Sequence, residues 1–268
     1  MTKKRICLIV LALILALPAN GISDPGIIIV DSLRVTDVMP HAFSAVWATS
    51  EPATCSLNLF VDAEGTVADQ QAQFISESAD HPPAENMGVM KVRAVGLTPN
   101  TSYFFQIKTV SKIDDTVSLY PSGPPFLEVM TEKTATIVEN YMVAQKVSLD
   151  NDKPAVGMLL IASVPRASYP ITCWVGRGGP KKWALINMDN FYDSETHTNL
   201  ELEGDEDIEV ELFGGFQGSI RARHRIPRER HKVKQLGSSD SVLRLRQKKP
   251  GKIIHKNQRG AISTIRNE

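Results

Sequence analysis

Between residues 27 and 132, apolar and polar residues alternate in short runs that are broken by proline and glycine. Apolar side chains occupy every second position at Phe43, Ala45 and Trp47, at Leu57 and Leu59, at Val92 and Ala94, and at Tyr103, Phe105 and Ile107. A period of two is typical of β-strands that bury one face. Ranges such as Pro121–Pro125 supply the breaks between strands. The pattern predicts a first β-sandwich over residues 27–132.

The second half of the chain shows another set of short strand patterns. After a polar linker at Thr131–Thr136, strands are predicted at Val156–Val164, Ile171–Val175, Trp183–Met188, Asn199–Leu202, Ile208–Phe213 and Ser219–Ile226. The first of these is continuously apolar, which is typical of a strand buried on both faces. A second β-sandwich is therefore predicted over residues 136–227. The predicted fold class is all-β, with two tandem immunoglobulin-like sandwich modules.

Residues 1–21 have the order of a secretory signal peptide. Lys3, Lys4 and Arg5 precede twelve consecutive apolar residues, Ile6–Leu17, and small residues follow at Ala19 and Gly21. Twelve residues of helix reach only about 18 Å, which is too short for a stable transmembrane anchor. The sequence predicts a signal helix that is removed, and a mature protein that is secreted, periplasmic or on the cell surface.

Charge is distributed unevenly along the chain, although the formal net charge is zero. Residues 221–268 carry 15 Lys and Arg against three acids, whereas residues 24–220 carry 12 cations against 27 acids. Residues 228–268 are poor in aromatic residues and are predicted to form a disordered basic tail. The tail could contact an anionic surface or the acidic body, or be simply solvated. Nucleic acid is a poor match for an exported protein.

One motif in the first module is more specific than its strand pattern. Leu97, Pro99, Thr101 and Tyr103, in GLTPNTSY, resemble the tyrosine corner of fibronectin type III domains, and Trp47 falls where that family has a core tryptophan. The module is also similar to the fibronectin-like domain that precedes the catalytic domain of purple acid phosphatases. The Gly-Asp-x-x-Tyr and Gly-Asn-His motifs of those enzymes are absent, and roughly 135 further residues are too few for their catalytic fold.

The layout of the second module resembles transthyretin-like or carboxypeptidase-regulatory-like sandwiches. The similarity lies in an apolar strand, VGMLLIASV, followed by the strand WALINM and by the pair around IEVELFGG. The resemblance implies a folding or adhesion module and provides no catalytic residues.

Several residues are candidates for binding, each with a structural alternative. Trp174, Trp183 and Tyr192 could form an aromatic platform for a glycan, or could pack in the core. The acidic run Glu201–Glu211 could bind calcium, but it lacks EF-hand spacing and alternation places several acids on a solvated strand face. His197 stands alone. No catalytic residue, metal site or cofactor is therefore predicted.

Cys55 and Cys173 fall one in each predicted module. They are interpreted either as two buried, unreactive thiols or as one bridge between the modules. The sequence as a whole predicts an exported, non-catalytic binding or structural protein that presents loops to a protein or glycan at the cell envelope. The alternative is an accessory module of an extracellular hydrolase system that lacks its catalytic domain.

Overall fold

The computed structural model describes residues 31–133, 141–230, 232–246, 255–256 and 262–263. β-Strands are the main regular secondary structure of this part of the chain, as the predicted all-β class requires. The helices in it are short: α1 (Pro82–Asn86), η1 (Met188–Asn190) and η2 (Gly215–Gln217). None of them is long enough to cross a membrane. The predicted signal segment, residues 1–21, and the start of the first module at residues 27–30 lie outside the described residues.

Two sheets form the N-terminal half. Sheet I joins β3 (Ala53–Phe60) to β6 (Ser102–Ser111), and β6 then pairs with β7 (Val117–Tyr120) and β8 (Leu127–Met130). Sheet II has the order β1 (Asp31–Met39), β2 (Ala42–Ala48), β5 (Val89–Val95) and β4 (Gln73–Ser76). Phe43, Trp47, Phe105 and other buried side chains from both sheets form one core cluster, so this half is β-sandwich-like.

Two further sheets form the C-terminal half. Sheet III has the order β11 (Ile171–Trp174), β10 (Leu159–Ser163), β13 (Asp207–Phe213) and β14 (Ser219–Arg225). Sheet IV is built on β9 (Met142–Leu149), which pairs with β12 (Trp183–Asn187), β15 (Lys234–Gln235) and β16 (Val242–Leu245). Leu160 and Leu212 of sheet III and Val143 and Ile186 of sheet IV belong to one buried cluster. A separate short pair joins β17 (His255–Lys256) to β18 (Ile262–Ser263).

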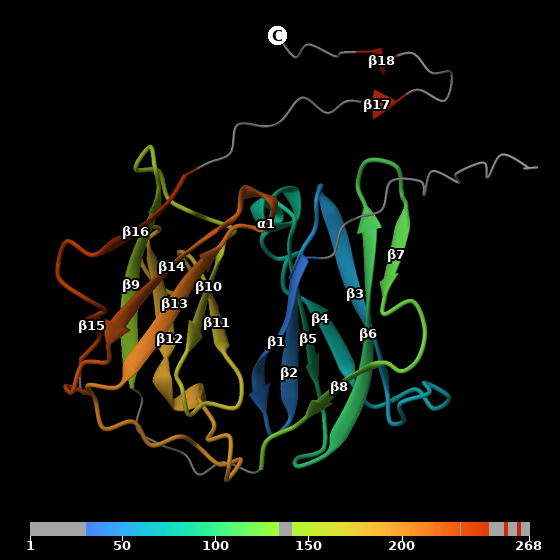
Figure 1. The fold of residues 1–268 in the computed structure, drawn as a ribbon, viewed down its shortest axis with the longest axis horizontal. Coiled ribbons are helices and arrows are strands. Elements are labelled where there is room, and N and C mark those ends of the chain that lie inside the picture. The colour runs from blue at the N-terminus through green and yellow to red at the C-terminus, as the bar shows by residue number, and fades with distance from the viewer. Residues whose placement is uncertain (1–30, 134–140, 231, 247–254, 257–261, 264–268) are drawn as a thin grey trace, which may run out of the picture.

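The two halves pack against each other through sheets II and III, which gives four layers in the order I, II, III and IV (Figure 1). Val46 and Val89 from sheet II belong to a third buried cluster, together with Leu159, Ile161, Trp174 and Phe213 from sheet III. Alternate residues of β2 therefore serve different cores, and all seven residues of this strand are buried. Alternate residues of β10 likewise belong to different cores, and its first four residues are buried, which explains why its sequence is apolar on both faces.

A bidentate ion pair lies at the edge of this contact. The Arg34 guanidinium on β1 donates to both carboxylate oxygens of Glu211 on β13, at 2.8 and 3.1 Å. Glu211 also accepts from Arg221 Nε at 2.8 Å. Because charged residues on covered sheet faces need partners, this pair allows Glu211 to be buried between the halves.

The halves also approach closely at α1. A Cβ at Gly157 would lie 2.8 Å from the Ala84 nitrogen, and a Cβ at Gly215 would lie 2.2 Å from the Met87 carbonyl oxygen. Both glycines have positive φ angles, of 84° and 58°. Glycine at these two positions therefore lets the backbones of the two halves touch.

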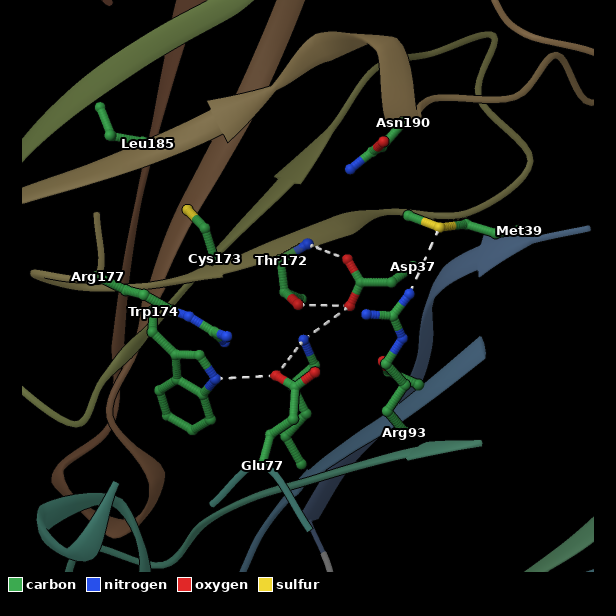
Figure 2. Close-up of a pocket in the computed structure, with 12 residues that line it drawn as sticks. Asp37, Met39, Glu77, Arg93, Thr172, Cys173, Trp174, Arg177, Leu185 and Asn190 are labelled. Carbon is green, nitrogen blue, oxygen red and sulfur yellow. Dashed lines mark hydrogen bonds and ion pairs between the residues drawn. The ribbon is translucent and has the colours of Figure 1, made fainter. Parts of the chain in front are cut away.

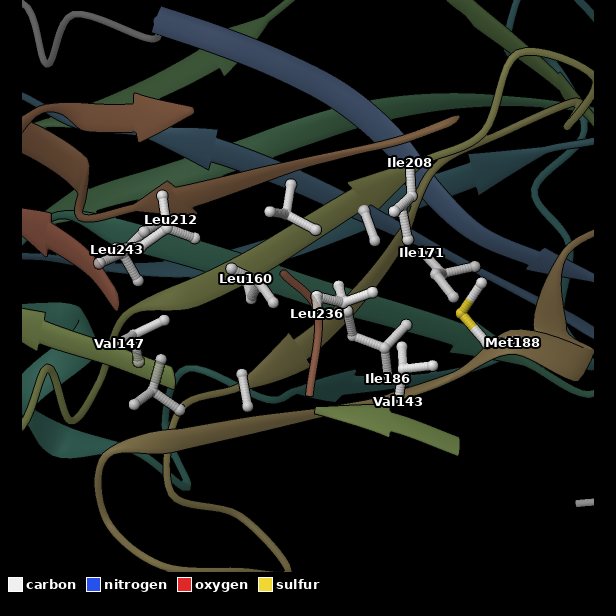
Figure 3. Close-up of a cluster of buried hydrophobic side chains, with 14 of the residues drawn as sticks. Val143, Val147, Leu160, Ile171, Ile186, Met188, Ile208, Leu212, Leu236 and Leu243 are labelled. Carbon is white, nitrogen blue, oxygen red and sulfur yellow. The ribbon is translucent and has the colours of Figure 1, made fainter. Parts of the chain in front are cut away.

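The prediction of a disordered tail from residue 228 is wrong for its first part. β15 and β16 pair in parallel with β9, and Leu236, Leu243 and Leu245 are buried in the core between sheets III and IV. Figure 3 shows Leu236 and Leu243 among the other side chains of this core. The basic composition of residues 228–268 concealed this sparse apolar pattern, in which Leu243 and Leu245 are buried and Arg244 between them is exposed.

Two strand predictions in the C-terminal half also need correction. The predicted second module contained no strand before residue 156, but β9 (Met142–Leu149) is the central strand of sheet IV. The predicted strand at Asn199–Leu202 is an irregular segment that contributes one isolated bridge, between Tyr192 and Asn199. Polar residues within β9, such as Gln145 and Ser148, are buried and obscured its strand pattern.

We predict that Leu243→Ala lowers the free energy of unfolding by about 2–5 kcal/mol, because it leaves a cavity in the core. Val233→Ala is the matched control: Val233 is 55% exposed in the same segment, and its loss should change stability by no more than about 0.5 kcal/mol. Urea unfolding of both variants gives the comparison. Equal, small effects would show that the tail does not complete the core.

Candidate functional site

The main polar site lies in the contact between the two halves. A cavity of about 270 Å³ there is lined by residues of sheets II and III and of nearby loops. Figure 2 shows the side chains around it, with Asp37, Glu77 and Arg93 from the N-terminal half and Thr172 and Trp174 from the C-terminal half. Clefts between domains are common positions for ligand sites.

Lys91 is the central charge of this site. It lies on β5 and is 5% exposed. Its ammonium is 3.1 Å from Asp37 Oδ2 and 3.0 Å from Glu77 Oε2. Burial lowers the pKa of Lys91, but the two carboxylates raise it by more, so the pKa lies above its ordinary value. Lys91 is therefore a permanent cation between two acids.

The two carboxylates each connect the halves. Asp37 accepts hydrogen bonds from the backbone N–H of Thr172 at 2.7 Å and from its hydroxyl at 2.5 Å. Glu77 accepts from the indole N–H of Trp174 at 3.0 Å. Burial raises the pKa of Glu77, but Lys91 and the Trp174 hydrogen bond outweigh it, and the pKa lies below its ordinary value. Both acids thus contact Lys91 in their own half and a residue of β11 in the other half.

The backbone at Asp37 is part of this arrangement. Its φ angle of 51° lies in the left-handed region, which aspartate tolerates better than most residues. Its N–H also donates to the Pro170 carbonyl at 2.9 Å, across the contact between the halves. Both the main chain and the side chain of Asp37 therefore bind the segment around β11.

The three aromatic candidates do not form one platform. Trp174 is 2% exposed, and its ring lies 4.3 Å from that of His81, centroid to centroid. Trp183 starts β12 in sheet IV, whereas Tyr192 is buried and lines a second cavity of about 460 Å³. Trp174 joins the halves, and its buried indole is not available for stacking on a glycan in this arrangement.

Of the fibronectin-like motif residues, Trp47, Leu97 and Tyr103 lie in the core of the N-terminal half, and Pro99 and Thr101 are partly buried. The Tyr103 hydroxyl accepts a hydrogen bond from the Thr98 backbone N–H at 2.9 Å, and the Thr101 hydroxyl donates to the Pro99 carbonyl at 3.0 Å. Leu97 is 3% exposed and Trp47 is fully buried. These residues stabilise the half and do not reach the cavity. Membership of the fibronectin family stays a prediction.

The acidic strand β13 is neutralised by its neighbour β14. Their register places Asp207, Glu209 and Glu211 opposite Arg225, Arg223 and Arg221, and each acid forms an ion pair with the arginine facing it. Among the described residues, no three of His, Cys, Asp and Glu gather as a metal ion would require. In the acidic segment Glu201–Glu211, which was considered for calcium binding, the acids on β13 are therefore already paired with arginines.

His197 has a partner that the sequence did not reveal. Its Nδ1 lies 2.9 Å from Oε2 of Glu132, which is fully buried just after β8. Burial raises the pKa of the Glu132 carboxyl, and the histidine partly offsets that rise. The backbone N–H of Lys133 also donates to the His197 carbonyl at 3.0 Å. This pair fixes the end of the N-terminal half to the η1–β13 segment.

Cys55 and Cys173 are both free thiols, so the bridge that the sequence left open is not formed. Burial raises the pKa of Cys55 to about 11 and that of Cys173 to about 12. Cys173 lines the cavity but stays protonated at neutral pH, so it is a poor nucleophile.

Comparison of the chain with models of known protein families and with curated proteins finds no match.

We predict that Lys91→Met destabilises the protein by about 3–5 kcal/mol, because it leaves two buried carboxylates without their cation. Lys182→Met is the matched control: it breaks the pair with Asp152, whose side chain is 72% exposed, and should cost at most about 1 kcal/mol. Denaturant unfolding measures both variants. Similar costs would contradict a central role for Lys91.

Stability should also depend on pH through Glu77. Because its folded-state pKa lies below the ordinary value of 4.5, its contribution is present above about pH 4.5 and is lost as the pH falls through the folded-state pKa. We predict that Glu77→Gln makes the free energy of unfolding fall less steeply as the pH drops below about 4.5. Between about pH 6 and pH 8 the pH dependence should be unchanged. Thermal unfolding measured over both the acid limb and the neutral range compares the two chains; an identical acid limb would refute the role of Glu77.

Proposed function

We propose that this chain is an exported, non-catalytic binding protein of the cell envelope, built from two β-sandwich modules. The first module would be fibronectin type III-like and the second transthyretin-like, as their motifs and strand layout suggest. The two would act as one rigid support for the loops at their ends.

The protonation states in the interdomain cavity carry the non-catalytic part of this proposal. A nucleophilic lysine or cysteine needs a lowered pKa, whereas the pKa values of Lys91 and Cys173 are raised. A carboxylate acting as general acid needs a raised pKa, whereas that of Glu77 is lowered. The strongest charge cluster of the site is therefore suited to holding the halves together.

The packing of sheets II and III supports the rigid presentation of loops. Apolar contacts, the Arg34–Glu211 pair and the Lys91 cluster all cross the same contact. Loops on two halves that are fixed in this way keep a constant relative position, and a partner that binds both avoids the entropic cost of ordering them.

Contact with an anionic surface is assigned in this proposal to residues 247–268, the part of the basic tail that follows β16. Residues 247–268 hold six of the Lys and Arg residues and one acid, Glu268. A cluster of cations attracts anionic polysaccharide or lipid at low salt, and the attraction weakens as salt screens it.

We predict that residues 24–268 are retained on envelope preparations, and that residues 24–246 are retained roughly tenfold less at low salt, because six cations are lost. Truncation after residue 246 spares Leu243 and Leu245, and an equal unfolding midpoint would verify that the shorter chain is folded. Sedimentation with envelope fractions measures retention. Absence of retention, or turnover of phosphate esters or glycosides by the purified chain, would contradict the proposal.

A further inference from the structure

Two polar groups on sheet II face the interdomain cavity without a hydrogen-bond partner. Ser44 is fully buried on β2, and its hydroxyl has no partner among the described residues. Arg93 lies directly opposite it on β5. In the part of the chain that the structure describes, the buried Arg93 Nε has no partner, and the guanidinium makes one polar contact, with the Met39 sulfur at 3.8 Å. Both residues line the cavity.

An unpaired guanidinium in such a position is unfavourable. Burying a charge without a counter-charge costs free energy, as does leaving a buried hydroxyl without a hydrogen bond. Within the described residues Arg93 forms no ion pair, and the nearby acids Asp37 and Glu77 are paired with Lys91. An anion that accepts from both Arg93 and Ser44 would satisfy these two groups together.

The C-terminal half adds donors on the other side of the same cavity. Arg177, in the glycine-rich β11–β12 loop, and Asn190, at the end of η1, both line it (Figure 2). Arg177 also forms no ion pair within the part of the chain that the structure describes. The cavity thus places arginines from both halves around one space, beside the saturated Lys91 cluster. Arginine and amide donors suit a planar carboxylate.

A second, mainly apolar cavity adjoins this one. Its volume is about 460 Å³, and Met39 and Arg93 line both cavities. Pro40, Ala42, Val95 and Tyr192 contribute to its remaining wall. A ligand whose anionic group meets Arg93 could therefore place an apolar body against this wall.

We propose that the cleft between the halves binds a small organic acid, with its carboxylate on Arg93, Ser44 and Arg177 and its apolar body in the cavity beside Tyr192. This site is separate from the contacts proposed for the envelope, and it does not depend on them. The ligand would stabilise the arrangement of the two halves because its partners come from both.

Isothermal titration of the full chain with phenylacetate, acetate and inorganic phosphate tests the site. Phenylacetate should bind, and should raise the unfolding midpoint, whereas acetate and phosphate should bind at least about tenfold more weakly because they lack an apolar body. Equal affinity for the three anions, or no binding of phenylacetate, would overturn the proposal.

Variants locate the binding. Arg93→Met should weaken phenylacetate binding roughly ten- to a hundredfold, since it removes a charged hydrogen bond. Arg177→Met removes a cation at the rim and should weaken it at least about threefold; this exposed position keeps the test decisive if Arg93→Met does not fold. Arg223→Met, whose side chain is 80% exposed on β14, removes the same charge elsewhere and should leave the affinity unchanged. Equal effects of Arg177→Met and Arg223→Met would refute the site.

Discussion

Burial of sheets II and III on both faces is the constraint on which the rest of this structure depends. Each of these sheets packs on an outer sheet through one face and on the other half through the opposite face. Polar side chains on the second face have little access to water, so partners within the protein stabilise them. Arg34 meets Glu211 and Lys91 meets two acids for this reason.

Apolar and polar groups contribute in different ways to the contact between the halves. Val46, Leu159 and their neighbours bury apolar surface, and this hydrophobic stabilisation does not depend on direction. The hydrogen bonds of Asp37 and Glu77 to the β11 strand are directional and define one alignment of the two sheets. A buried ion pair often adds little net stability over an apolar pair, so its main effect here is to specify how the halves align.

The sequence predicted the all-β class and most strands, because alternation and apolar runs are local signals. It could not predict the interdomain site. Lys91 and Arg93 alternate with core residues on β5, which is the pattern of a solvated face. Only the packing of a second half, through residues distant in sequence such as Thr172, shows that this face is covered. The prediction of a disordered tail was wrong for its first part because it rested on the many cations there and overlooked the three leucines that fill the core.

The position of β16 has a consequence for biosynthesis. Its leucines pack beside β9, almost a hundred residues earlier in the chain, so they are synthesised long after that strand. The core between sheets III and IV therefore cannot close until β16 has been synthesised, whereas the N-terminal half has all its strands by residue 130. Domains commonly fold in the order of their synthesis. A nascent chain of this protein would thus keep its C-terminal half open until β16 emerges.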